Sequence, residues 1–111
     1  MEFNEKYNWD GISTVVIDNG KTVASILVKE LIPSETKVIW LSNLWVEESW
    51  RKQGIAAFLN SWVTAKYSKS LILTSISANN LTMIKIMRRF GFILLSSVDG
   101  TLIYQRPPCT G

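Results

Sequence analysis

The sequence predicts an α/β protein of the α+β type, with one mixed sheet and two helices. Two observations predict it. Apolar and β-branched residues gather in short runs that are typical of strands, and in two places they recur at helical spacing instead. Asn-Gly and Asp-Gly pairs, the strongest short hairpin signals, join neighbouring strand segments. The predicted order is β-β-β-α-β-α-β-β in a chain of 111 residues, which suits one domain.

The first half of the chain is predicted to form strands. Residues 12–18 (ISTVVID) are rich in β-branched residues, and residues 22–31 form the returning strand after the Asn19-Gly20 turn. Residues 37–46 (KVIWLSNLWV) are almost continuously apolar. Such a run is typical of a strand that is buried on both faces.

The apolar period then changes. Helical spacing predicts a helix over residues 55–67, and residues 71–76 (LILTSI) form another apolar strand. Because a helix joins them, strands 37–46 and 71–76 are expected to be parallel, with a right-handed crossover.

A second helix is predicted to begin at Asn80, since an Asn side chain can cap the first free N–H groups. Gly91 fits a left-handed cap at the end of that helix. Two strands follow, over residues 92–97 and 101–106, and an Asp-Gly hairpin turn joins them.

Composition excludes several classes of protein. The chain has no histidine, and Cys109 is its one cysteine, which removes Ser-His-Asp and Cys-His catalysis, internal disulfides and most zinc sites. No apolar run reaches the ~18 residues of a membrane span, and the acidic N-terminus lacks the apolar stretch of a signal peptide. We expect a cytoplasmic protein without a bound metal. Its single domain spans residues 1–111, with 1–11 as an N-terminal segment and 107–111 as a tail.

Charge is divided unevenly between the two halves of the chain. Residues 1–49 contain four basic and eight acidic residues, whereas residues 50–98 contain seven basic residues and no acidic one. A segment without carboxylates suits a polyanionic partner, and a solvated basic surface would have the same composition.

Residues 51–56 (RKQGIA) join strand 37–46 to helix 55–67 and predict an anion site. The first N–H groups of a helix have no acceptor inside the helix, and the helix dipole adds partial positive charge there. A Walker A loop would need Lys-Ser/Thr after its last glycine, and a dinucleotide fingerprint would need three spaced glycines. Neither is present, and the pattern that remains is Arg-x-x-Gly-x-Gly/Ala.

This turn resembles the signature of the GCN5-related N-acetyltransferases (GNAT). In that family it follows a strand that ends in Val and an aromatic residue, here Val46 and Trp50. A second family feature is an Asn that opens the next helix eleven residues before a Gly-Phe pair, and Asn80 to Gly91-Phe92 has that spacing. The resemblance covers roughly residues 12–106. The chain resembles a short form of the family that lacks the usual N-terminal strand and two helices.

The resemblance implies that acetyl-CoA (coenzyme A) is the cofactor. The backbone amides of the turn would hold its pyrophosphate. Pantetheine would lie like an added strand on the free edge of strand 37–46, where that strand splays from strand 71–76. The residues implied in cofactor binding are Leu44, Trp45, Val46, Arg51, Lys52, Gln53, Gly54, Ile55, Ala56, Asn80, Met87 and Arg88.

The catalytic residues are less well marked than the cofactor turn. In the family, a Tyr seven residues after the Asn often protonates the leaving thiolate. Met87 stands at that position and cannot donate a proton. Strand 37–46 has no carboxylate, so its polar members Ser42 and Asn43 are the candidates to order a water that takes the proton of the amine.

The N-terminus affects the prediction for the acceptor. Members of the family usually begin with a strand and two helices that wall the acceptor site, whereas about eleven residues precede the first predicted strand here. The acceptor side is therefore expected to be open or completed by a second subunit, and a homodimer is compatible with this.

The favoured function is an N-acetyltransferase that moves the acetyl group of acetyl-CoA to a primary amine by direct attack on the thioester. The amine could belong to a protein lysine or N-terminus, a polyamine or another molecule. The alternative is a catalytically weakened acyl-CoA-binding or protein-interaction module, which Met87 and the short N-terminus would suit. A nucleic-acid binder is disfavoured, because the basic segment lacks an aromatic-basic binding pattern. A membrane partner is not expected.

Overall fold

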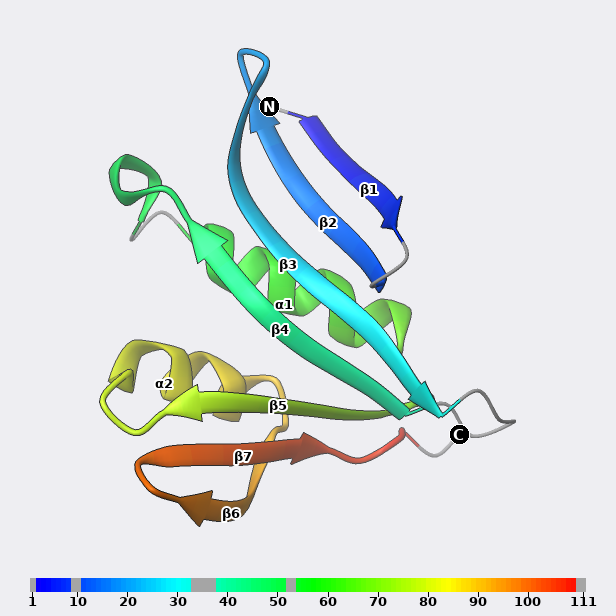
Figure 1. Cartoon of the computed structure of the whole chain (residues 1–111), viewed down its shortest axis with the longest axis vertical. Coiled ribbons are helices and arrows are strands. Elements are labelled where there is room, and N and C mark those ends of the chain that lie inside the picture. The colour runs from blue at the N-terminus through cyan, green and yellow to red at the C-terminus, as the bar shows by residue number, and fades with distance from the viewer. Residues whose placement is uncertain (1, 9–10, 33–37, 52–53, 110–111) are drawn as a thin grey trace.

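The computed structural model describes residues 2–8, 11–32, 38–51 and 54–109. In these ranges the chain forms one seven-stranded sheet and two α-helices (Figure 1). In chain order the elements are β1 (Glu2–Asn8), β2 (Gly11–Asp18), β3 (Lys21–Ile32), β4 (Val38–Val46), the short 3-10 helix η1 (Glu48–Trp50), α1 (Ile55–Lys66), β5 (Leu71–Ser77), α2 (Leu81–Arg89), β6 (Ile93–Val98) and β7 (Thr101–Arg106).

The strands lie in the order β1-β2-β3-β4-β5-β7-β6. All neighbouring strands are antiparallel except β4 and β5, which are parallel and joined through α1. This confirms the predicted mixed α+β fold and its parallel pair. The helices and strands that the sequence predicts from residue 12 onward are all present.

The prediction missed one strand, β1. It lies within the stretch that we expected to be only an N-terminal segment, so the order begins with four strands rather than three. β1 pairs with β2 along its whole length, from Glu2 opposite Ile17 to Asn8 opposite Gly11. Only residues 9 and 10 separate the two strands, which leaves no room for helices between them.

Contacts with α1 explain why β1 is a strand. The Phe3 ring packs edge-on against Phe58 and Trp62 of α1, with centroids 5.4 and 4.6 Å away. Two residues further along β1, Glu5 forms an ion pair with Lys66 of the same helix. These partners lie far away in the sequence, so the polar sequence of β1 carries little local strand signal.

The hydrophobic core lies between the sheet and the helices. Leu59 and Val63 of α1 are fully buried against Ile26, Leu41 and Ile72 of the strands. Figure 1 shows α1 lying across β3 and β4, and α1 also contacts α2. No helix in the described part of the chain is long and apolar enough to cross a membrane.

Local signals place the ends of several elements. Asn19 and Gly20 both have positive φ, as do Asp99 and Gly100, which is the geometry of the tight hairpin turns predicted at these two pairs. Asn80 caps α2 as predicted: its Oδ1 accepts a hydrogen bond of 3.2 Å from the N–H of Met83.

Candidate functional site

The two parallel strands β4 and β5 separate part of the way along their length. Their pairing ends where Leu41 lies opposite Thr74. Beyond that point β4 continues to Val46 along β3, and β5 continues to Ser77 along β7 (Figure 1). Among the described strands, none pairs with the edge of β4 that faces β5 after Leu41. This is the splay that the family resemblance implied.

An irregularity in β4 accompanies the separation. Ser25 of β3 lies opposite Trp45, and Leu27 lies opposite Ser42. Two residues of β4, at positions 43 and 44, therefore face Ile26 alone. Such a bulge bends a strand and increases its local twist. The bulge could not be predicted from the sequence, because it depends on the register of two strands.

A groove of about 470 Å³ lies between the end of β4, the first turn of α1 and α2. Eight of the residues predicted to bind the cofactor line this groove: Leu44, Trp45, Val46, Arg51, Gly54, Ile55, Ala56 and Asn80. The α2 residues Thr82, Met83 and Ile86 also line it and were not predicted. Their helical spacing after Asn80 places them on the same side of α2, which is the signal that could have identified them.

The first turn of α1 has the geometry of an anion site. Gly54 precedes the helix with φ +81°, in the left-handed region, and a Cβ added there would meet nothing within 4 Å. The first intrahelical bond runs from the Phe58 N–H to the Gly54 carbonyl, at 2.9 Å. The N–H groups of Ile55, Ala56 and Ala57 precede it and have no acceptor inside the helix.

Arg51 connects the end of β4 to this turn. Its Nε donates a hydrogen bond of 3.1 Å to the main-chain carbonyl of Val46. The bond spans η1 and holds the exposed side chain at the groove, while the terminal guanidinium nitrogens take no part in it. Lys52 and Gln53, which were also predicted to bind the cofactor, lie outside the described residues.

A second, smaller cavity of about 220 Å³ adjoins the groove at the point where the strands separate. Leu44, Asn80 and Met83 line both, so the groove and this inner pocket are adjacent. Ser42 and Met87 line the inner pocket and not the groove. The Met87 side chain is 2% exposed, so it also belongs to the hydrophobic core.

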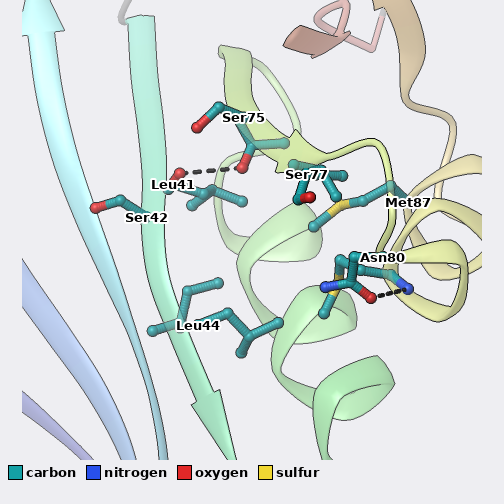
Figure 2. A pocket seen from close by; sticks show the side chains of 11 residues that line it. Leu41, Ser42, Leu44, Ser75, Ser77, Asn80 and Met87 are labelled. Atoms are coloured by element: carbon teal, nitrogen blue, oxygen red, sulfur yellow. Dashed lines mark hydrogen bonds between the residues drawn. The ribbon is translucent and has the colours of Figure 1, made fainter. Parts of the chain in front are cut away.

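Figure 2 shows how the polar side chains of the inner pocket lie. In this view the Met87 side chain ends near Ser77, whereas the hydroxyl of Ser42 points away from both. The oxygen of Asn80 is turned toward its hydrogen bond with the Met83 N–H. Ser75 and Ser77 of β5 line the pocket and were not predicted, although serines in an otherwise apolar strand could have indicated them. The side chain of Asn43 is not described.

Charge is sparse in both cavities. Among the described residues that line them, Arg51 is the only member of the charged residue types Asp, Glu, Lys and Arg. Arg88 is exposed on α2 and lines neither cavity, and neither do Tyr67 and Tyr104. Burial raises the pKa of the Tyr67 hydroxyl at the end of α1. The cavities thus offer main-chain groups, small hydroxyls and one guanidinium.

Residues 2–92 match the model of the acetyltransferase (GNAT) family. The chain belongs to this family, and the match begins within β1, the strand that the sequence prediction had left out. None of the curated protein sequences matches the chain significantly.

Solved structures of N-acetyltransferases have the same fold. The ribosomal-protein-S18-alanine N-acetyltransferase of Escherichia coli has a TM-score of 0.77 at 18% identity, covering 95% of this chain and 74% of that one. Naa50 of Arabidopsis thaliana, solved with the bisubstrate analogue CoA-Ac-MVNAL, has a TM-score of 0.73 at 20% sequence identity. The match covers 85% of this chain and 71% of that one. The ribosomal-protein-alanine N-acetyltransferase of Brucella melitensis has a TM-score of 0.70 at 20% sequence identity. The match covers 86% of this chain and 68% of that one.

Proposed function

We propose that this protein is an acetyl-CoA-dependent N-acetyltransferase that acts on a primary amine. The observation that carries the proposal is a row of two adjacent cavities, which follows the free edge of β4 from the first turn of α1 to the place where β4 and β5 separate. Its two ends differ in chemistry: one offers helix amides and a guanidinium, and the other is small, neutral and partly apolar. An extended ligand with phosphates at one end and a thioester at the other matches both.

The residues of the turn fit a pyrophosphate. Gly54 has open space where a side chain would stand, and Ala56 and Ala57 are small, so phosphate oxygens can approach the amides. Lys52 and Gln53 complete the proposed turn in sequence. We propose Arg88 only as a contact for the outer phosphate, because its side chain is exposed beyond the groove.

The free edge of β4 fits the pantetheine arm. After Leu41 the main chain of β4 has no strand partner on the β5 side. An extended, amide-bearing ligand can pair with such an edge as an added strand would. Leu44 and Asn80 flank both cavities, so they would contact the arm where it passes from the groove into the inner pocket.

Bound acetyl-CoA would supply an activated acetyl group at the inner pocket. The chain would hold the thioester beside main-chain N–H groups of β4, which can stabilise the charge that develops on a carbonyl oxygen. The described side chains that line the two cavities include no carboxylate, so we propose that a water takes the proton of the amine. Ser42 and Asn43 remain the proposed residues to order it, although the Ser42 hydroxyl points away from Met87 and Ser77. Ser77 is a further hydroxyl in the same pocket.

We propose a macromolecular amine, a protein N-terminus or lysine, as the acceptor. Trp45, beside the groove, is 44% exposed, and only residues 9 and 10 stand between β1 and β2, where two helices would otherwise narrow access. The Naa50 structure holds an analogue that joins CoA to the peptide MVNAL, which lends support to a peptide amine. A single domain, a cytoplasmic location and a homodimer remain proposals.

The alternative is an acyl-CoA-binding module with weakened catalysis. Met87 favours it, because a buried thioether stands in the inner pocket where a proton donor would serve the leaving thiolate. The alternative predicts the same affinity for acetyl-CoA but no acetyl transfer.

Isothermal calorimetry with CoA and acetyl-CoA tests the shared step. Binding at micromolar concentration is expected, and its absence would overturn both candidates. Thiol release is then measured with three acceptors: a peptide with a free N-terminus, an N-blocked peptide that contains lysine, and spermidine. Release with a peptide supports the enzyme, release with spermidine alone overturns the macromolecular acceptor, and no release with any acceptor favours the binding module.

A further inference from the structure

Helix α1 carries a polar residue at a fully buried position. Asn60 is 0% exposed and follows the buried Leu59 on the side of the helix that faces the core. Buried polar atoms in folded proteins almost always have hydrogen-bond partners. Within the described residues, Oδ1 of Asn60 is buried and has none. The side chain therefore needs an explanation other than core packing.

The amide nitrogen of the same side chain contacts both helical walls of the groove. Nδ2 donates a hydrogen bond of 2.9 Å to the Ala56 carbonyl in the first turn of α1. It also lies 4.0 Å from Sδ of Met83 in α2. Ala56 lines the groove, and Met83 lines both the groove and the inner pocket. Asn60 itself lines neither, so it acts from beneath the groove.

The contact extends to Asn80. The main-chain N–H of Met83 is held by Oδ1 of Asn80, which lines both cavities. Asn60 thus connects the first turn of α1 to the first turn of α2. The connection runs through Met83, whose sulfur contacts Asn60 and whose main-chain N–H is bonded to Asn80. Residues of both turns line the groove, so the spacing between the two turns affects its width.

Folding alone would favour an apolar residue at position 60. Leucine has the same branched shape as asparagine, and a buried acceptor without a partner lowers stability. Replacing such a group by an apolar one of similar shape is commonly neutral or stabilising. Stability is therefore given up at this position.

We propose that Asn60 is a positioning residue for coenzyme A, which holds the first turn of α1 and the start of α2 at the spacing that the ligand requires. This inference rests on the proposed function. It concerns a residue outside the lining of both cavities, and it predicts that binding and stability respond to substitution in opposite directions.

The test compares Asn60→Leu with Asn60→Ser in the full chain. Leucine removes the donor and the orphaned acceptor, so we expect the melting temperature without ligand to rise by about 4 °C. Its dissociation constant for CoA should increase about tenfold. A serine hydroxyl can still donate to the carbonyl four residues earlier. Asn60→Ser should therefore bind CoA more tightly than Asn60→Leu and melt at a lower temperature.

Thr64→Val is the matched control. Thr64 is also buried in α1, and its hydroxyl donates to the carbonyls of Asn60 and Ser61, at 2.9 and 3.1 Å, one turn further from the groove. Its dissociation constant for CoA should stay within about twofold of the wild type.

Three results would overturn the inference: unchanged affinity in Asn60→Leu, equal losses in Asn60→Leu and Thr64→Val, or affinity and melting temperature falling together across the Asn60 variants. If the wild-type protein does not bind CoA, the proposed function fails and the inference falls with it. If the wild-type protein binds CoA and one of the three results is found, the inference alone has failed.

Discussion

The buried hydroxyl of Thr74 donates a hydrogen bond of 3.0 Å to the main-chain carbonyl of Leu41, at the last paired position of β4 and β5 (Figure 2). Beyond this bond the two strands diverge and the inner pocket begins. A side chain thus satisfies a main-chain acceptor at the point where the strand ladder stops. The bond anchors the base of the candidate site.

Thr74→Val tests this role. Valine keeps the shape of threonine but leaves the buried Leu41 carbonyl without this donor, so we expect a loss of about 1–2 kcal/mol in the free energy of unfolding. Urea denaturation measures it. Thr74→Ser keeps the hydroxyl and should lose less. Equal stability of Thr74→Val and the wild type would show that another donor satisfies the carbonyl.

Gly54→Glu tests the anion turn. A carboxylate would enter the open space beside the helix amides, where the phosphates are proposed to lie, so CoA binding should be lost in calorimetry.

Gly100→Glu is the matched control for this substitution. Gly100 has φ +80° and equally open surroundings, in the hairpin between β6 and β7. The two variants carry the same charge and similar backbone strain, of about 1–2 kcal/mol, so Gly100→Glu should bind CoA as the wild type does. Equal binding by both variants would contradict the assignment of the turn.

Met87→Tyr tests whether the core has room for a proton-donating side chain at this position. Because Met87 is 2% exposed, tyrosine overpacks the core, and we expect a loss of about 1–3 kcal/mol in the free energy of unfolding. Met87→Leu should cost less than about 1.5 kcal/mol and leave thiol release within about twofold. Loss of thiol release in a folded Met87→Leu protein would show that the sulfur has a part in turnover.

The ion pair between Glu5 and Lys66 predicts a pH dependence of stability. The hydrogen bond from Lys66 lowers the pKa of Glu5, and the hydrogen bond to Glu5 raises the pKa of Lys66. The contribution of Glu5 to the free energy of unfolding is therefore complete above its ordinary pKa of 4.5. It is lost as the pH falls through the lower pKa of the folded state. The contribution of Lys66 is complete below its ordinary pKa of 10.5 and is lost as the pH rises through the higher pKa of the folded state.

Urea unfolding of the wild type and Glu5→Gln measures this dependence. Since the pair is partly exposed to solvent, the difference near neutral pH should be below about 1 kcal/mol. It should shrink as the solution is acidified below pH 4.5. A difference that does not change with pH would mean that the charge of Glu5 does not hold β1 to α1.

Several features of this protein could be predicted because they depend on neighbouring residues. The hairpin turn at Asn19-Gly20 and the cap that Asn80 forms on the Met83 N–H involve groups within a few positions of one another. The position of the glycine before α1 is of the same kind, and Gly54 adopts a left-handed conformation that glycine takes at little steric cost.

The rest was decided by contacts between distant residues. β1 is a strand because Phe3 and Glu5 meet α1, whose residues follow more than fifty positions later. The bulge in β4 exists only in its register with β3, and Asn60 is informative only because α2 brings Met83 against it. The sequence by itself predicted the elements from residue 12 onward and the glycine-bearing turn before α1, since local backbone preferences act within one turn of chain. Only the tertiary structure decided the width, depth and lining of the groove, because packing brings together segments that no local pattern relates.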